Sequence, residues 1–326
     1  MARVYKFHPP RSVLFITTSL EEGLLLKPNP LIRLILESCL AKAQALHRVR
    51  ICHFLFEETH VHMILVVDNP EDIPNFIGRF KTESAHAINR LLGRRKRTVW
   101  CEGYDSPILG SPVDVIKQLV YLYTNPSKDD LVDSIEEYPN LSTWENYKTK
   151  EHKIASIPYK RRDIHKLSSL NPTDVEILNN VQRLEEEYPD RIELELAPDA
   201  WMEIMEVPDR DRAKINERII SIVHKTDTRF QKRREKEQKK AMGRERLLTS
   251  PFSLNYKSER KGKKSYCISS SISLRVHIIQ TVKALINKGK EVLEKWRAGD
   301  HALRYPIGIY PPSMPRMGNL IPGVVV

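Results

Sequence analysis

The stretch from Thr59 to Val67 constrains the fold more than any other part of the chain. It reads Thr-His-Val-His-Met-Ile-Leu-Val-Val, two histidines one residue apart followed by an apolar, β-branched run. Such a run predicts a strand, in which alternate residues face the same side. His60 and His62 therefore share one face and can share one metal ion, whereas Val61 faces a core. Two half-buried histidines on an ordinary strand would give the same local pattern, so the pair needs support from elsewhere.

A second stretch, Val120–Pro126, reads Val-Tyr-Leu-Tyr-Thr-Asn-Pro and ends a segment with helical spacing of apolar residues. Residues four apart lie on one face of a helix. Tyr121 and Asn125 can therefore present a phenol and an amide oxygen side by side. Tyr123, two residues further on, points roughly 200° away from Tyr121. Pro126 is expected to stop the helix.

The two motifs together, in this order and spacing, resemble those of the single-tyrosine HUH transposases. Among these the chain is most similar to the REP-associated tyrosine transposases, in a long form with a carboxy-terminal extension. The resemblance spans residues 8 to 147 and includes a later Glu137-Tyr138-Pro139 block. It implies an α+β fold, the HUH nuclease fold, in which helices cover a ferredoxin-like antiparallel sheet.

The resemblance also implies a chemistry. Tyr121 would be the nucleophile of a metal-dependent strand transferase and endonuclease, forming a 5′-phosphotyrosine on single-stranded or hairpin, REP-like DNA. His60, His62 and Asn125 would be the metal ligands, and such a mixed set suits Mg²⁺ or Mn²⁺. Tyr123 is the rival nucleophile. Related enzymes include dimers that exchange the tyrosine helix, so a monomer and a homodimer both stay open.

A basic cluster follows the second long helix. Arg94, Arg95, Lys96 and Arg97, with Trp100 just beyond, are typical of a groove that binds the backbone and bases of a DNA strand. A solvated basic turn is the alternative.

Three further polar residues lie near the histidine strand. His53, on the preceding strand, is expected to be a packed histidine. Glu57 and Glu58 are expected to form a solvent-exposed turn, although Glu58 could also bind the metal or orient one of its ligands.

The predicted elements give the order β-α-β-β-α-β-α, which is typical of a ferredoxin-like α+β layer. The residue ranges are strands at 12–18, 49–56 and 59–67, helices at 30–47, 70–92 and 111–125, and a strand or loop near 97–105. Asn29 is expected to cap the first helix, with Pro30 in its first turn.

The chain divides into a transposase domain at 1–147, a basic linker at 148–170 and a mainly helical basic region at 171–326. This last region would add accessory DNA contacts. A helix at 271–298 is expected to carry an apolar core stripe, a basic run occupies 257–264, and prolines extend the tail at 305–312.

The net charge of +11 and a pI near 9.4 favour a polyanionic partner. No apolar run reaches the length of a membrane span, and the four cysteines lack metal-type spacing. These features indicate a cytoplasmic, nucleoid-associated protein with no membrane partner.

Three other functions share part of the pattern. A non-catalytic regulator that binds hairpin DNA or RNA would not require the full set of histidines, tyrosine and asparagine. A relaxase or replication initiator usually adds a third histidine, a second tyrosine or a helicase segment, and no Gly-x-x-x-x-Gly-Lys-[Ser/Thr] phosphate loop is present. An unrelated metallohydrolase would not need Tyr121.

Overall fold

The structure is a computed structural model that describes residues 8–21, 23–69, 71–95, 97–256 and 265–306. Its main sheet has the strand order β3-β4-β1-β5-β9. The first four strands are antiparallel to their neighbours, and β9 joins β5 in parallel. The strands are β1 (Ser12–Ser19), β3 (Arg50–Phe56), β4 (His60–Val67), β5 (Ile108–Leu109) and β9 (Cys267–Ile268).

Two helices complete the ferredoxin-like unit. α1 (Pro30–Leu46) connects the β1 region to β3, and α2 (Asp72–Leu91) follows β4. With β1 lying between β4 and β5, the unit has the β-α-β-β-α-β topology predicted from the sequence. The α+β class and the antiparallel core of the sheet are therefore confirmed.

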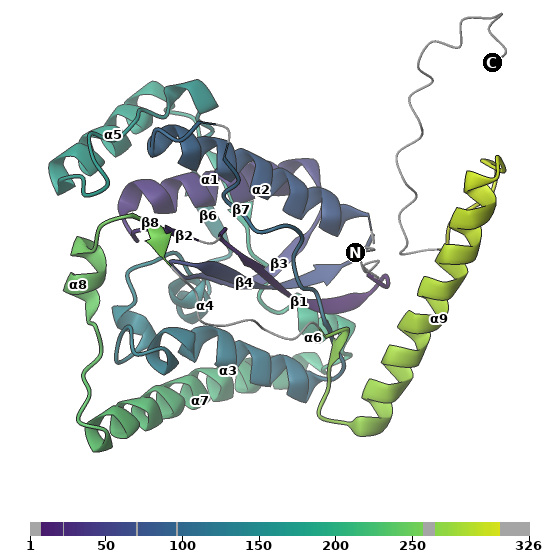
Figure 1. The fold of residues 1–326 in the computed structure, drawn as a ribbon. Helices are drawn as coiled ribbons and strands as arrows, with labels where there is room; N and C mark the ends of the chain where they lie inside the picture. Colours follow the sequence, from purple (N-terminus) through teal and green to yellow (C-terminus); the bar gives the residue numbers. More distant parts are fainter. Residues whose placement is uncertain (1–7, 22, 70, 96, 257–264, 307–326) are drawn as a thin grey trace, which may run out of the picture.

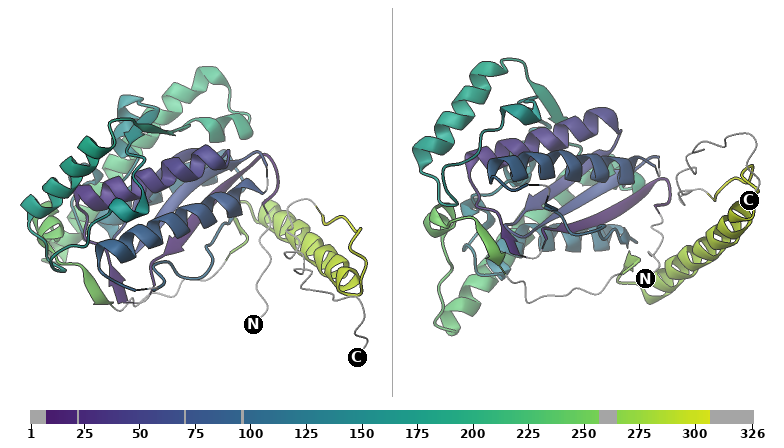
Figure 2. Two further views of the ribbon diagram at one scale, coloured as in Figure 1. Left: turned by 90° about the horizontal axis from the view of Figure 1, so that it is seen from above. Right: turned by 45° about the horizontal axis from the view of Figure 1, so that its top comes forward.

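The sheet separates two layers of helices (Figures 1 and 2). One face, with Val61 and Met63, packs with α1 and α2 in one apolar cluster. The other face, with Ile64 and Val66, packs against α3 (Pro112–Lys128). Because side chains alternate along β4, His62 lies on the same face as α3.

Helix starts follow the local sequence closely. The Asn29 side chain accepts a hydrogen bond from the Ile32 amide at 2.9 Å, and Pro30 opens α1 as expected. Ser111 caps α3 in the same way, and its hydroxyl lies 3.3 Å from the Asp114 amide. These caps satisfy amides that have no partner inside the helix.

The end of α3 differs from the prediction. The helix does not stop at Pro126 but continues to Lys128, and the Asp129 amide donates to the Asn125 carbonyl at 3.0 Å. A proline in the last turn removes only one backbone bond, so the helix tolerates it there. As a result, Lys128 belongs to the same helix as Tyr121.

Residues 148–170, expected to be a linker, pack onto the ferredoxin-like unit. They include β6 (Lys153–Ser156), which pairs with β7 (Ile192–Glu195), and the short helix η2 (Arg161–Asp163). Ile157 and Tyr159 are buried in the same cluster as α1 and α2. Apolar residues interspersed among the lysines and arginines explain the difference, because they supply enough buried surface to fix the segment.

Much of the carboxy-terminal region also packs on this unit. α5 (Asp174–Glu187) lies on α1, and β8 (Ser253–Tyr256) pairs with the short β2 (Gly23–Leu25). The other elements of this region are α6 (Ala200–Ile204), α7 (Asp209–Lys236) and α8 (Arg244–Thr249). Two short helices, η1 (Ile135–Glu137) and α4 (Trp144–Thr149), precede it and follow α3.

α7 runs along the outer side of α3 (Figure 1). The Arg234 side chain is only 2% exposed and donates to the Ser127 carbonyl and to the Asp133 carboxylate, the latter at 2.6 Å. The Asp227 carboxylate accepts from the Ser127 hydroxyl at 2.6 Å and from the Ile135 amide at 3.2 Å. This network fixes the end of α3, where Asn125 lies.

α9 (Ile272–Arg297) begins at its Ser271 cap, as predicted. Of the expected core stripe Val282 is buried, whereas Leu274, Ile278, Leu285 and Leu293 are half-exposed. The basic run at 257–264 and residues 307–312 of the tail lie outside the described residues. Within the described part of the chain, every helix is too short or too polar to cross a membrane.

We predict that Arg234→Ala lowers the free energy of unfolding by about 2 to 3 kcal/mol, because the Ser127 carbonyl of α3 and the Val132 carbonyl just beyond it lose their buried donor. Urea denaturation followed by circular dichroism measures this. Arg229→Ala is the matched control on the exposed side of the same helix and should change stability by less than about 0.5 kcal/mol. Equal effects of the two substitutions would contradict the assigned network.

Candidate active site

The two histidines of β4 both direct their Nε2 atoms toward one point. The Nε2 atoms of His60 and His62 lie 3.0 Å apart. The other ring nitrogens are held by hydroxyls, since His62 Nδ1 lies 2.8 Å from Thr17 Oγ1 and His60 Nδ1 lies 3.0 Å from Thr59 Oγ1. Partners of this kind commonly orient metal-binding imidazoles. Thr17 is also the cross-strand neighbour of His62 in β1.

α3 brings its polar side chains to the same point. The Asn125 amide nitrogen lies 3.4 Å from His60 Nε2, and rotating the amide by half a turn would present its oxygen there instead. The half-buried Tyr121 ring lies 5.5 Å from the His62 ring, centroid to centroid. The structure therefore brings together the four residues selected from the sequence motifs.

Tyr123 points the other way, as the helical geometry predicted. It is fully buried, and its hydroxyl lies 2.7 Å from His53 Nδ1 and 2.9 Å from Thr143 Oγ1. The Nε2 atom of His53 lies 3.2 Å from the Pro198 carbonyl, which can only accept, so Nε2 carries the proton and Nδ1 accepts from Tyr123. His53 is thus the packed histidine expected from the sequence.

Burial shifts the pKa values of this pair in opposite directions. It raises the pKa of the Tyr123 phenol far above its usual value and lowers the pKa of His53 to about 3. The Tyr123 phenol is therefore held neutral, without access to solvent or substrate.

Glu57 and Glu58 are buried, which corrects the prediction of a solvent-exposed turn. The reason is a distant segment: the Tyr138 hydroxyl donates to the Phe56 carbonyl at 3.1 Å, and the Phe56 amide donates to Leu141 at 2.9 Å. Residues 138–141 therefore cover the hairpin. This contact joins parts of the chain about 80 residues apart, so the local sequence does not reveal it.

Glu57 contacts two of the candidate metal ligands. Its Oε2 atom lies 3.6 Å from His60 Nδ1, and its carboxylate interacts with the Asn125 side chain. Burial, followed by repulsion from Glu58, raises the pKa of Glu57 to about 8, and burial raises the pKa of Glu58 to about 7. Among the described residues, the Oε1 atoms of both carboxylates have no hydrogen-bond partner. Buried carboxyl groups of this kind are typical of functional sites.

Lys128 is a candidate site residue that the sequence analysis missed. Its Nζ atom lies 3.4 Å from Asn125 Oδ1 and 5.0 Å from the centre of the Tyr121 ring. The spacing of Lys128 in the sequence could have identified it, because it follows Asn125 by three residues and Tyr121 by seven and so lies on the same helix face. We did not consider Lys128 because the helix was expected to end at Pro126.

The geometry fits a divalent cation. Two neighbouring ligands of an octahedral ion, each about 2.1 Å from it, are about 3.0 Å apart, which is the separation of the two Nε2 atoms. The described residues include no cluster of three or more His, Cys, Asp or Glu side chains that could hold a metal. The candidate third donor here is instead the Asn125 amide, and the Glu57 carboxyl group lies behind His60 and Asn125.

The basic cluster after α2 divides into two groups. Arg95 and Arg97 are exposed, and Lys96 lies outside the described residues. Arg94 is held in an ion pair with Glu21. Trp100 is only 7% exposed, and its indole N–H donates to Ser84 Oγ at 2.9 Å. The Trp100 ring is thus packed in the core, whereas the sequence predicted an aromatic side chain in a DNA-binding groove.

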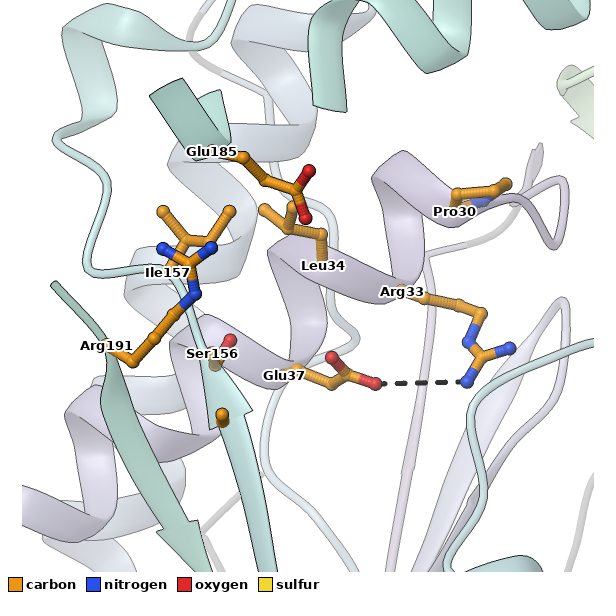
Figure 3. Close-up of a pocket in the computed structure, with 9 residues that line it drawn as sticks. Pro30, Arg33, Leu34, Glu37, Ser156, Ile157, Glu185 and Arg191 are labelled. Carbon is orange, nitrogen blue, oxygen red and sulfur yellow. Dashed lines mark ion pairs between the residues drawn. The ribbon is translucent and has the colours of Figure 1, made fainter. Parts of the chain in front are cut away.

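A cavity of about 250 Å³ lies on the opposite side of the sheet, between α1, β6 and α5 (Figure 3). Its charged groups balance one another, and Arg33 pairs with Glu37 at 4.0 Å. Its lining residues are Pro30, Arg33, Leu34, Glu37, Ala155, Ser156, Ile157, Glu185 and Arg191. None of these is a residue of the histidine site.

A ferredoxin-like sheet with paired histidines, opposed by a helix with tyrosine and asparagine, is the arrangement expected for the HUH class. Residues 27–125 match the family of IS200-like transposases. No curated protein matches the chain. A solved structure of a REP-associated tyrosine transposase bound to a REP hairpin is 17% identical, with a TM-score of 0.38, over 46% of this chain and 87% of the other.

We predict that Tyr123→Phe lowers the free energy of unfolding by about 1 to 2 kcal/mol, because His53 and Thr143 lose a buried hydrogen-bond partner. Thermal and urea denaturation measure this loss. Tyr121→Phe, two residues away on a half-buried face, should change stability by less than about 0.5 kcal/mol. A larger loss in Tyr121→Phe than in Tyr123→Phe would reverse the two roles.

Proposed function

We propose that this protein is a DNA strand transferase that cuts and rejoins single-stranded DNA through a covalent 5′-phosphotyrosine at Tyr121. The observation that carries the proposal is the convergence of His60, His62, Tyr121 and Asn125 from two separate elements. The burial of Tyr123 adds support, since it leaves Tyr121 as the accessible phenol of the motif.

His60, His62 and Asn125 would hold Mg²⁺ or Mn²⁺, which when bound would neutralise charge on the non-bridging oxygens of the scissile phosphate. Glu57 would act from behind these ligands by orienting His60 and Asn125. Hydroxyls of Thr17 and Thr59 would keep both imidazoles turned toward the phosphate.

Tyr121 supplies the nucleophile. The phenol, whose ordinary pKa is about 10, must lose its proton before attack. The Lys128 ammonium group stands near its ring and favours the phenolate by charge. The phenolate oxygen attacks phosphorus in line, the Tyr121 Oη–P bond forms, and the P–O3′ bond breaks. The departing 3′ oxygen takes up a proton and leaves as a hydroxyl.

Rejoining reverses these steps without ATP. The 3′-hydroxyl of an incoming strand loses its proton and attacks the phosphotyrosine, which forms a new P–O3′ bond and releases Tyr121 as phenolate. Because Tyr121 stands beside His62 of the same chain, the arrangement favours a site completed within one monomer.

The proposed substrate is hairpin DNA of the REP type with an unpaired flank. The match of residues 27–125 to the IS200-like transposases supports a DNA substrate, and the net charge of +11 is consistent with it. The resemblance of the Tyr-Leu-Tyr-Thr-Asn-Pro block to REP-associated enzymes supports the hairpin. Arg95 and Arg97 are exposed and available for phosphate contacts.

We predict that the wild-type chain, incubated with a labelled hairpin DNA and Mn²⁺, forms a covalent adduct that survives denaturing electrophoresis. Tyr121→Phe should form none, because it lacks the phenol oxygen, and chelation of the metal with EDTA should abolish the wild-type adduct. Tyr123→Phe is the matched control and should retain the adduct. Hairpin binding without any adduct in the wild type would instead indicate a non-catalytic regulator.

We predict that Lys128→Ala slows adduct formation by about 10²-fold, the usual effect of removing a charged group that stabilises developing charge. Lys128→Arg should recover much of the rate, and hairpin affinity should change little in either variant. Lys117→Ala, on the exposed surface of the same helix, is the control and should react at the wild-type rate. Single-turnover kinetics measure all four proteins, and an unchanged rate in Lys128→Ala would remove Lys128 from the mechanism.

A further inference from the structure

The outer face of α7 carries a line of cations that the proposed chemistry does not use. At 100° per residue they fall within about 60° of one another around the helix axis, on the side away from the buried Val223. All six are exposed. We call them the α7 stripe: Lys214, Arg218, Lys225, Arg229, Lys232 and Lys236.

None of the six residues of the α7 stripe forms an ion pair with a carboxylate of the described chain. Other basic residues of the same helix do: Arg212 pairs with Asp209 at 2.7 Å, and Arg234 pairs with Asp133 at 2.6 Å. Like charges three or four positions apart destabilise a helix. The stripe therefore holds positive charge that the described part of the protein does not compensate.

The carboxy-terminal end of the α7 stripe lies near the carboxy-terminal end of α3. A hollow of about 390 Å³ is lined there by Arg229, Lys232, Arg233, Lys236 and Glu237. The Arg233 guanidinium donates to the Lys128 carbonyl at 3.2 Å. This hollow therefore adjoins the end of α3, three residues from Asn125.

We propose that the α7 stripe binds the phosphate backbone of the hairpin stem while the unpaired strand occupies the histidine site. From Lys214 to Lys236 the helix rises about 33 Å, close to the length of one turn of B-form DNA, about 34 Å. The identity of the polyanion as DNA rests on the proposed function. Residues 27–125, which match the transposase family, do not include α7.

The test measures binding of the full-length chain to a fluorescent DNA hairpin in EDTA, where no cleavage occurs, over a series of salt concentrations. The stripe variant combines Lys225→Gln, Arg229→Gln, Lys232→Gln and Lys236→Gln. Each lost phosphate contact reduces the slope of log K against log salt by about 0.9 for duplex DNA. The slope should fall by about 3 to 4 when all four cations contact the stem.

The matched control removes four exposed cations from α9 instead, with Lys283→Gln, Lys288→Gln, Lys290→Gln and Lys295→Gln. Both variants reduce the net charge from +11 to +7, so a general charge effect would be equal in the two. A larger reduction of the salt slope in the stripe variant than in the α9 variant supports the proposal. Equal reductions in the two variants overturn it.

Two further measurements keep the result interpretable. The same pair of proteins is also measured on an unpaired strand of the same length. The stripe substitutions should reduce the salt slope less for this strand than for the hairpin. An equal or larger reduction would assign the stripe to single strands and overturn the stem assignment. If the quadruple variant melts earlier than the wild type, Arg229→Gln and Lys232→Gln are measured singly, each with an expected change of about 0.9. Because binding is measured without cleavage, a failure of the proposed chemistry would not alter this outcome.

Discussion

The register between β1 and β4 is the constraint on which the site depends. Thr17 stands opposite His62 and Ser19 opposite His60, so the pairing places both histidines on the face that α3 covers. A shift by one residue would turn them toward α1 and α2 and turn Val61 toward α3. The apolar residues of β4 forbid this shift, since each face of the strand packs into its own core. Burial of those residues thus fixes the direction of the imidazoles.

The second constraint is the position of α3. Leu119, Leu122 and Tyr123 hold one side of the helix in the core, which leaves Tyr121 and Asn125 facing the histidine end of the sheet. Arg234 and Asp227 of α7 then fix the last turn of α3 through Ser127. The region after residue 147 is therefore part of the framework that positions the site.

The site also holds polar groups that a stable core would avoid. Glu57 and Glu58 are buried with a carboxylate oxygen each that lacks a partner among the described residues, and their pKa values are raised to about 8 and about 7. Natural proteins accept such local conflicts mainly where function requires them. The position of Glu57 behind His60 and Asn125 is consistent with a role in orienting these candidate ligands or in balancing the charge of a bound cation.

The sequence by itself determined what depends on local periodicity: the histidines on one face of a strand, Tyr121 and Asn125 on one face of a helix, the Asn29 cap, and the order of elements that gives a ferredoxin-like sheet. Only the tertiary structure decided which polar residues are buried. The cover of Glu57 by residues 138–141, the core position of Trp100, and the packing of 148–170 all depend on contacts between distant segments. Strands repeat every two residues and helices every 3.6, so the face on which a side chain lies can be predicted from the local sequence. Burial depends instead on which distant segment the fold packs against each side chain.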